Sequence, residues 1–341
     1  MAKTKVAING LGRIGRAFLK TAWLEEGLEI VAVNDLGNLD NLAYLLNYFS
    51  AYVQWKLEIN TAPGQIIING RPIKFVQEKD PAKLPWGELG VDVVVESTGV
   101  FETFVKAKAH LDAGAKKVVV TAPVKDEPLA DIACSTILMG VNDDDLASQI
   151  ITSNGSCTTN ASAPLIRILD ETIGIEKALL STVHGYTATQ KLVDSPDAKD
   201  WRRGRAGAVN IVPSTTGAAQ TVAKVWPAVD GKFDGLSLRV PVLTGSIVDV
   251  TFIAKRATSV EEVNAILTKA ATDTHWQGIF SVTTEQLVSA DIVGTPYASL
   301  ADLSCTKVAD GNLVKVLAWY DNEMGYVHTL VRHVLKINSI V

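Results

Sequence analysis

The chain contains 341 residues, of which 47% are hydrophobic and 20% are charged, and it carries a net charge of −5 at pH 7. A chain of this length exceeds the usual size of a single hydrophobic core, so we expect two domains. The acidic balance argues against a nucleic-acid partner, because the basic cluster at residues 201–205 is more typical of a local anion site. No apolar stretch reaches the roughly 18 residues of a membrane span, and no signal peptide is predicted. We therefore expect a cytoplasmic protein without a membrane partner.

The cysteine content limits the kinds of site that the chain can build. Its three cysteines, Cys134, Cys157 and Cys305, are too few and too widely spaced for a disulfide framework or a zinc site. Such a count is typical of a reducing compartment, and we expect no metal. Each cysteine therefore has to be interpreted on its own.

The first third of the chain predicts strands that alternate with helices. The predicted strands are 5–9, 29–34, 91–96 and 117–121, and the predicted helices are 13–24 and 101–113. Continuous apolar strands joined by helices favour a parallel sheet that is covered on both faces. Residues 65–75 predict a hairpin around an Asn69-Gly70 turn, inserted in this domain.

After residue 153 the pattern changes. The predicted helices are 158–173 and 322–337, and the longer predicted strands are 179–186, 236–241, 247–254 and 313–320. Few helices separate these strands, which favours a mixed or antiparallel sheet. Residues 187–214 form a long stretch with little periodicity, and such loops are usually functional. The fold class is therefore α/β: a Rossmann-type parallel-sheet domain and an α+β domain with a mixed or antiparallel sheet.

A dinucleotide-binding motif lies between the first predicted strand and the first helix. Residues 10–15 read GLGRIG. Gly10, Gly12 and Gly15 suit a tight turn, close approach of the backbone to a pyrophosphate, and close helix packing. Asp35 ends the next strand, where its carboxylate can accept hydrogen bonds from ribose hydroxyls. The same carboxylate repels a 2′-phosphate, so we expect NAD as the cofactor and NADP to be less favoured.

Cys157 is the predicted nucleophile. It lies in the segment SNGSCTTN, between a predicted strand and a helix, where the helix N-terminus stabilises a thiolate. Cys134 and Cys305 lack this setting and are expected to be small buried residues. Among five histidines, His184 closes a strand before the long loop and is the predicted base. The others, His110, His275, His328 and His333, are expected at the surface or in packing roles.

Cysteine, histidine and a nicotinamide site together indicate oxidation of an aldehyde. A thiolate adds to the aldehyde, hydride leaves to the nicotinamide while His184 removes the hydroxyl proton, and a thioester remains. The residues leave the acceptor of the thioester open, since water would give an acid and phosphate an acyl phosphate.

At these residues the sequence resembles the phosphorylating glyceraldehyde-3-phosphate dehydrogenase family over essentially the whole chain. The matching blocks lie at 8–16, 96–99, 153–160, 184–190, 214–219, 238–241 and 319–325. The resemblance implies a Rossmann NAD-binding domain at 1–153, completed by the C-terminal helix at 322–341, and a catalytic domain at 154–321. It also implies a homotetramer, and inorganic phosphate as the acceptor of the thioester.

The resemblance assigns roles residue by residue, with Cys157 as nucleophile and His184 as base. The cofactor site would comprise Gly10, Gly12, Arg13, Ile14, Gly15, Asp35, Lys79, Ser97, Thr98, Thr121 and Asn322. The inorganic-phosphate pocket would comprise Ser156, Thr158, Thr216, Gly217 and Arg203, while Thr187 and Arg239 would hold the phosphate of the substrate. Hydroxyls, backbone amides and arginines are the groups that an oxyanion needs.

Several positions depart from the family pattern. Ala161 replaces the usual second cysteine, so no disulfide can form beside Cys157. Gly185 replaces the usual alanine and is expected to loosen the strand of His184. Residues 242–246 also differ, which affects the expected shape of the phosphate site near Arg239. Asp197, in the long loop, would add negative charge near a neighbouring subunit's adenosine and favours NAD.

Two alternatives remain at this point. Erythrose-4-phosphate dehydrogenase shares the fold and the cysteine–histidine pair but releases an acid, and the block at 187–190 favours the triose enzyme over it. A non-catalytic NAD-binding protein on the same fold would be expected to lose Cys157 or His184, and both are present.

Overall fold

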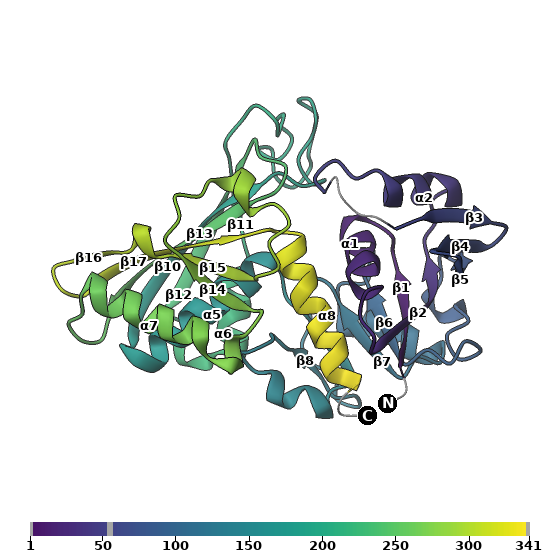
Figure 1. Cartoon of the computed structure of the whole chain (residues 1–341), viewed down its shortest axis with the longest axis horizontal. Helices are drawn as coiled ribbons and strands as arrows, with labels where there is room; N and C mark the ends of the chain where they lie inside the picture. The colour runs from purple at the N-terminus through teal and green to yellow at the C-terminus, as the bar shows by residue number, and fades with distance from the viewer. Residues whose placement is uncertain (1–2, 53–56, 339–341) are drawn as a thin grey trace. The chain divides into compact units, whose positions relative to one another are not determined.

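The computed structural model describes residues 3–52 and 57–338. They form two compact units (Figure 1). The first comprises the described residues of 1–139, 143–155 and 330–341, and the second comprises 140–142 and 156–329. The chain passes from the first unit to the second between Gly155 and Ser156, directly before Cys157. Among the described residues, no helix is both long and apolar enough to cross a bilayer.

The first unit is built on a mostly parallel sheet. Its strands are β1 (Thr4–Asn9), β2 (Leu28–Asn34), β3 (Ile59–Ala62), β4 (Gln65–Ile68), β5 (Arg71–Val76), β6 (Val93–Glu96), β7 (Lys117–Val120), β8 (Cys134–Thr136) and β9 (Ile151–Ser153). In the described residues their order is β3-β4-β5-β2-β1-β6-β7-β9-β8. All pairs are parallel except β3–β4 and β4–β5. The predicted parallel sheet is therefore confirmed.

The helices of the first unit are α1 (Arg13–Ala22), α2 (Leu39–Asn47), α3 (Phe104–Ala107) and α4 (Ala109–Asp112). The sequence predicts one helix around 101–113, and the structure has two short helices within this range. The helix begins at Phe104 because the side chain of Thr103 accepts a hydrogen bond from the amide of Lys106, and it is interrupted at Lys108. The predicted hairpin is confirmed, and β5 pairs with β2, so the hairpin extends the edge of the sheet.

The second unit holds a mixed sheet of longer strands. They are β10 (Ile175–Gly185), β11 (Val212–Thr215), β12 (Phe233–Val240), β13 (Ser246–Ala254), β14 (Phe280–Thr283), β15 (Ser299–Asp302), β16 (Lys307–Ala309) and β17 (Leu313–Tyr320). Their order is β11-β12-β10-β13-β17-β15-β14, with β16 beside β17. β10–β12 and β14–β15 are parallel and the other pairs antiparallel, as the predicted mixed sheet requires.

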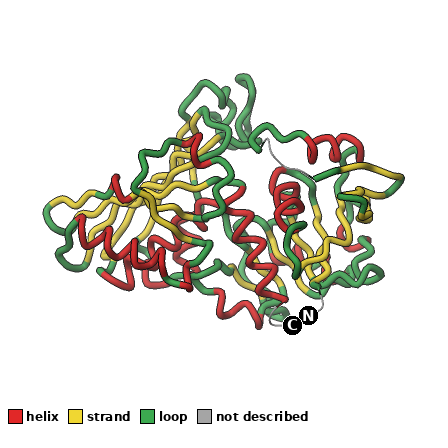
Figure 2. Tube along the Cα trace, viewed as in Figure 1, coloured by secondary structure: helices red, strands yellow, loops and turns green. Residues whose placement is uncertain are grey.

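Three helices pack on one face of this sheet: α5 (Cys157–Thr172), α6 (Ala218–Val225) and α7 (Val260–Thr272) (Figure 2). Burial alternates residue by residue along β13 and β17, because one side of each strand faces the helices. The opposite face of the sheet stays partly exposed.

Two predicted boundaries move for local reasons. The loop predicted to run to residue 214 ends at β11, the edge strand of the sheet, whose residues pair with β12. The last helix, α8 (Met324–Asn338), begins two residues later than predicted. The carboxylate of Asp321 accepts hydrogen bonds from the amides of Glu323 and Met324 and so caps this helix. Residues of α8 up to Thr329 belong to the second unit and those from Leu330 to the first.

Candidate active site

Cys157 is the first residue of α5, and the turn before it fixes the helix N-terminus. Gly155 has a φ of +62°, in the left-handed region that glycine tolerates best. Ser156 is the N-cap, and its hydroxyl accepts a hydrogen bond of 3.1 Å from the amide of Thr159. The thiol therefore lies at the positive end of a helix of 16 residues.

His184 and Arg239 meet beside this thiol. Nε2 of His184, in β10, is 3.3 Å from Sγ of Cys157. Its other ring nitrogen, Nδ1, is 2.6 Å from the carbonyl oxygen of Gly185 and 2.7 Å from Nη1 of Arg239. Arg239 occurs there because β10 and β12 pair in parallel with His184 opposite Arg239. The structure thus brings together three residues that are distant in sequence.

Nδ1 of His184 can satisfy only one of these two neighbours at a time. When Nδ1 carries the proton, it donates to the carbonyl of Gly185 and leaves a lone pair on Nε2 facing the thiol. When Nδ1 instead accepts from Arg239, Nε2 carries the proton and donates toward sulfur. In the first tautomer Nε2 can act as a general base, and in the second Nε2–H stabilises a thiolate. The imidazole can therefore carry its proton on Nδ1 or on Nε2.

Burial and positive charge act in opposite directions on the thiol. Burial raises the pKa of Cys157 above its usual value, and this effect is the largest. The charge of Arg239 and the amides at the start of α5 lower the pKa but do not outweigh burial. The sequence predicts a thiolate stabilised by the helix terminus. In the structure that stabilisation is present, but burial opposes it and favours the protonated thiol.

Tyr320 supports this pair and is a residue that the sequence analysis missed. Its hydroxyl lies 3.0 Å from Oγ1 of Thr158 and 2.7 Å from Oγ1 of Thr182. Its ring meets the imidazole of His184 edge-on, with centroids 5.9 Å apart. Burial raises the pKa of Tyr320, so the phenol stays neutral and ties α5 to β10. The local sequence around Tyr320 does not reveal this role, because the order of the strands in the sheet is what places β17 near His184.

The candidate phosphate ligands fall into separate groups. Arg203, Thr216 and Gly217 line one cavity. Arg203 donates to Oγ of Ser214, at 2.7 Å for the closer contact, and Gly217 is the N-cap of α6. Ser156 and Thr158 lie in the first turn of α5 beside Cys157.

Two phosphate candidates remain, Thr187 and Arg239, and Thr187 follows β10 by two residues. Its hydroxyl is 2.9 Å from that of Thr189. Arg239 is already placed beside the imidazole of His184. The structure therefore brings Arg239 next to the cysteine–histidine pair, while Arg203, Thr216 and Gly217 line a separate cavity.

The three glycines of the dinucleotide motif have different surroundings. A Cβ atom on Gly10, which has a φ of +96°, would lie 2.7 Å from the backbone nitrogen of Thr98. A Cβ on Gly15 would overlap the carbonyl oxygen of Gly10, so this glycine lets α1 pack on the strand end. A Cβ on Gly12 would meet no described atom within 4 Å. Gly12 thus keeps open a space that a ligand can use, as a pyrophosphate requires.

A cleft of about 910 Å³ opens beside this motif at the carboxyl ends of the parallel strands. Its lining includes six of the predicted cofactor residues: Gly10, Gly12, Asp35, Lys79, Ser97 and Thr98. Arg13, Ile14 and Thr121 line a smaller adjoining cavity of the same unit, which shares Ser97 and Thr98. Gly15 packs against the carbonyl oxygen of Gly10.

Asp35 is fixed at the end of β2 by two backbone amides. Its Oδ2 accepts from Leu11 at 2.6 Å and its Oδ1 accepts from Gly37 at 2.8 Å. Each carboxylate oxygen keeps a further lone pair for a ribose hydroxyl. The residues of the cleft therefore fit a dinucleotide, and the position of the carboxylate is determined before any ligand binds.

A buried polar network around Glu96 holds residues that line this cleft. Glu96 is 2% exposed and accepts hydrogen bonds from Asn9 and Thr98. Nε2 of His110 is 3.0 Å from the same carboxylate, and Nδ1 of His110 accepts from the indole of Trp86 at 3.1 Å. Because an indole only donates, Nε2 carries the proton of the imidazole. His110, expected at the surface or in packing, is fully buried in this network.

Asn322 belongs to the second unit, unlike the other cofactor candidates. Its Oδ1 accepts from Ser246 at 2.9 Å, and the hydroxyl of Ser246 accepts from the amide of Gly185. A side chain that is bonded in this way has a fixed orientation, with its Nδ2 donor directed away from Ser246.

Two of the departures from the family pattern are in contact. A Cβ on Gly185 would lie 2.9 Å from the carbonyl oxygen of Val242 and 3.2 Å from that of Leu243. The amide of Tyr186 donates to Val242 at 3.0 Å. The strand end is therefore closely packed against segment 242–246 rather than loosened, and the missing side chain is what permits the approach.

Cys134, Cys305 and His275 have surroundings of their own. Cys134 is buried in the core of the first sheet, as expected, whereas Cys305 is partly exposed, so the expectation that it is buried is wrong. His275 contacts the carbonyl oxygen of Gly140 at 2.8 Å. The described residues contain no group of three or more side chains suited to hold a metal ion.

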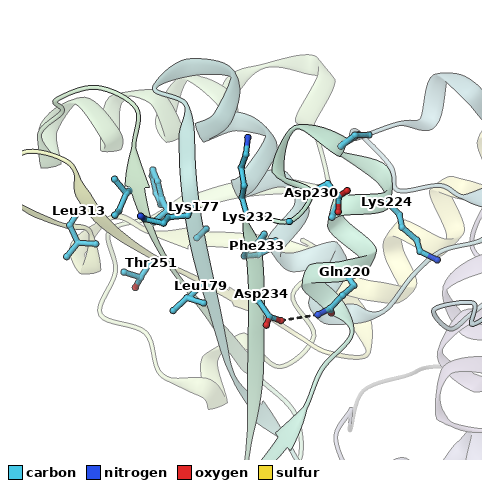
Figure 3. A pocket seen from close by; sticks show the side chains of 16 residues that line it. Lys177, Leu179, Gln220, Lys224, Asp230, Lys232, Phe233, Asp234, Thr251 and Leu313 are labelled. Carbon is cyan, nitrogen blue, oxygen red and sulfur yellow. Dashed lines mark hydrogen bonds between the residues drawn. The ribbon is translucent and has the colours of Figure 1, made fainter.

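A further cavity lies on the outer face of the second sheet (Figure 3). Leu179, Thr251 and Leu313 line it from β10, β13 and β17, and the side chain of Gln220 donates to Asp234 at its edge. None of the candidate site residues belongs to this lining.

Two family domains match the chain. The glyceraldehyde 3-phosphate dehydrogenase NAD binding domain matches residues 4–104, and the C-terminal domain of the same family matches residues 156–322. A glyceraldehyde-3-phosphate dehydrogenase from Streptomyces coelicolor is 48% identical over 331 residues, which are 96% of each chain. One from Clostridium pasteurianum is 46% identical over 96% of this chain and 97% of its own. Glyceraldehyde-3-phosphate dehydrogenase 1 from Kluyveromyces lactis is 46% identical over 97% and 99%. The chain therefore belongs to the glyceraldehyde-3-phosphate dehydrogenase family.

Proposed function

We propose that the protein oxidises D-glyceraldehyde 3-phosphate to 1,3-bisphosphoglycerate, with NAD as oxidant and inorganic phosphate as acceptor. The observation that carries the proposal is the contact of 3.3 Å between Sγ of Cys157, at the N-terminus of α5, and Nε2 of His184. A thiol paired with an imidazole is the arrangement that activates a cysteine nucleophile. The family named by the relatives supplies the substrate.

The first step makes a carbon–sulfur bond. Because burial keeps Cys157 protonated, Nε2 of His184 accepts the thiol proton as sulfur adds to the aldehyde carbon. The imidazole returns this proton to the new oxyanion, which gives a hemithioacetal. Nδ1–H of His184, donating to the carbonyl of Gly185, keeps the lone pair on Nε2 directed at the reacting atoms.

The second step oxidises the hemithioacetal. His184 takes the hydroxyl proton as the C–H bond breaks, and a thioester on Cys157 results. When bound, NAD supplies the acceptor that takes the hydride. A phosphate oxygen then attacks the thioester carbon, the carbon–sulfur bond breaks, and Cys157 leaves as a thiolate that Arg239 and the amides of α5 stabilise.

Two anion sites are part of the proposal. Thr187 and Arg239 hold the phosphate of the substrate, and Ser156, Thr158, Arg203, Thr216 and Gly217 hold inorganic phosphate. Binding of a phosphate by Arg239 would weaken its contact with Nδ1 of His184. That change favours the tautomer in which Nε2 is the base, so substrate binding and activation of His184 would coincide.

We assign the cofactor site to the glycine motif, Arg13, Ile14, Asp35, Lys79, Ser97, Thr98, Thr121 and Asn322. NAD is favoured over NADP because Asp35 lies in the cleft with both oxygens fixed. The first unit would be the NAD-binding domain and the second the catalytic domain, with the end of α8 returning to the first. The protein would act in the cytoplasm.

A homotetramer is consistent with the exposed face of the second sheet. Leu179 is 67% exposed, Leu236 46% and Leu313 44%, and all three lie on its strands (Figure 3 shows the first and the last). Exposed aliphatic side chains on one sheet face are typical of a subunit interface. Light scattering of the purified protein should give four times the mass of one chain, and a monomer would contradict the assembly.

The test is product analysis with labelled inorganic phosphate. We expect label in an acyl phosphate, formation of NADH only when phosphate is present, and loss of at least about a thousandfold in turnover in Cys157→Ser. Erythrose 4-phosphate serves as the second aldehyde. NADH formation that does not need phosphate would overturn the assigned acceptor, and full turnover by Cys157→Ser would overturn the nucleophile.

A further inference from the structure

A buried histidine in the last helix contacts the strand that leads to Cys157. His333, in α8, is fully buried. Its Nε2 is 2.9 Å from Oγ1 of Thr152, and its Nδ1 is 3.2 Å from Oδ1 of Asn154. Thr152 is 2% exposed and Asn154 is fully buried. All three residues belong to the first unit.

The hydrogen bonds fix one form of the imidazole. The amide oxygen of Asn154 can only accept, so Nδ1 of His333 carries the proton and donates to it. Nε2 then accepts from the hydroxyl of Thr152. Burial lowers the pKa of His333 to about 3, opposed by Asp143 and reinforced by Lys117 and Lys336. At neutral pH the ring is uncharged and each of its nitrogens has a partner.

The location of these bonds matters because Asn154 begins the turn to the nucleophile. Its amide donates to the carbonyl of Val120 in β7 at 3.0 Å. The neighbouring Ser153 donates its hydroxyl to Ala122 at 2.7 Å and accepts from the amide of Gly155. The backbone of this turn is thus tied to the β7 side, and the side chain of Asn154 is tied to α8. Cys157 follows three residues later.

The polar pair of His333 and Thr152 fills the space between α8 and β9 at a cost in free energy. An apolar pair of similar size would pack between a helix and a strand without desolvation of an imidazole and a hydroxyl. The polar pair offers direction instead, since the bond to Asn154 has one allowed geometry and an apolar contact does not.

We propose that His333 is a positioning residue for Cys157: it holds the side chain of Asn154 and thereby the strand-to-helix turn that presents the thiol. The inference rests on the proposed role of Cys157 as the nucleophile. His333 takes no part in the proton transfers, because both of its ring nitrogens are engaged inside the first unit.

Three variants separate positioning from packing. His333→Leu removes both bonds. Thr152→Val with His333→Leu replaces the bonded pair by apolar groups, which restores packing but leaves Asn154 without this donor. His333→Gln keeps a donor and an acceptor on one side chain. Thr152→Val alone is the matched control, because it leaves the bond to Asn154 in place.

The readout is the second-order rate of alkylation of Cys157 by iodoacetamide in the full-length protein, alongside kcat, KM for NAD and Tm. Cys157→Ser gives the background from Cys134 and Cys305. We expect His333→Leu and the double variant to slow alkylation and lower kcat by roughly tenfold with an unchanged KM for NAD. The double variant should regain the Tm that His333→Leu loses. His333→Gln and Thr152→Val should stay within about threefold of the wild type.

A double variant that alkylates and turns over at the wild-type rate would show that His333 only fills space. If His333→Leu does not fold, the double variant and His333→Gln still decide between the two roles. The alkylation rate reports the presentation of the thiol whether or not Cys157 is the catalytic group, whereas turnover by Cys157→Ser tests only the proposed function. The two failures are therefore distinguishable.

Discussion

The two units build their candidate sites in opposite ways. In the first unit the key residues follow one another in a short motif, and the positions of Gly10, Gly12 and Gly15 are set by backbone packing at the ends of neighbouring strands. In the second unit Cys157 and His184 come from different elements, and strand register brings Arg239 opposite His184. A site made of backbone should be sensitive to any added side chain. In a site made of side chains, a substitution should leave the stability of the fold nearly unchanged and lower the activity instead.

The largest expected effect is in the second unit. His184→Asn removes the proposed base while β10 keeps its hydrogen bonds, so we expect kcat to fall by about a hundredfold to ten-thousandfold with little change in Tm. Steady-state kinetics and calorimetry check this. A loss of Tm comparable to that of a core substitution would show that the catalytic half is as sensitive structurally as the cofactor half.

The next effect tests the first unit with a matched pair of glycines. Gly10→Ala places a side chain against the backbone at Thr98 with a positive φ, so both Tm and affinity for NAD should fall, the latter by roughly tenfold or more. Gly12→Ala meets open space in the described structure, so only the affinity should fall. Titration calorimetry measures the affinity of each variant for NAD, and scanning calorimetry measures its Tm. Equal losses of Tm in the two variants would contradict the separate roles of these glycines.

A smaller change is expected at Asp35. Asp35→Ala removes the carboxylate proposed to accept ribose hydroxyls and to repel a 2′-phosphate, so the ratio of kcat/KM for NAD to that for NADP should fall by about tenfold. The variant also loses the bonds to the amides of Leu11 and Gly37, and some loss of Tm should accompany it. An unchanged ratio would mean that the selectivity lies elsewhere in the cleft.

The smallest effect is expected at Tyr320. Tyr320→Phe leaves the hydroxyls of Thr158 and Thr182 without this partner but keeps the ring against His184, so stability should fall by about 1–2 kcal/mol. Turnover should change by only about threefold, because the phenol transfers no proton. Chemical denaturation and initial rates test both statements. A change in the pH profile of kcat would instead give Tyr320 a direct role.

The same contrast explains what could be predicted from the sequence. The glycine motif and Asp35 follow from spacing, because their chemistry is local to one strand–helix–strand unit. His184 could be selected from its place at the end of a strand. Tyr320 and the contact of Arg239 with His184 depend on which strands become neighbours, and strand order cannot be deduced from the pattern of a single strand.

Buried polar networks were the other feature that the sequence did not reveal. His110 and His333 occur in helical segments with polar neighbours, which favours a surface or packing position, yet each is fully buried with both ring nitrogens bonded. The partners lie far away in sequence: Glu96 for one, and Thr152 and Asn154 for the other. Helical periodicity indicates which face of a helix is apolar, but it does not reveal a polar partner supplied by a distant strand.

The close approach of Gly185 to Val242 couples two positions that are distant in the sequence. Since a methyl group at 185 would lie 2.9 Å from the carbonyl oxygen of Val242, an alanine there requires a different path for segment 242–246. The small residue at 185 and the path of segment 242–246 therefore depend on each other. A variant that introduces alanine at 185 should therefore also change segment 242–246. Alanine alone would place its methyl group against the carbonyl oxygen of Val242.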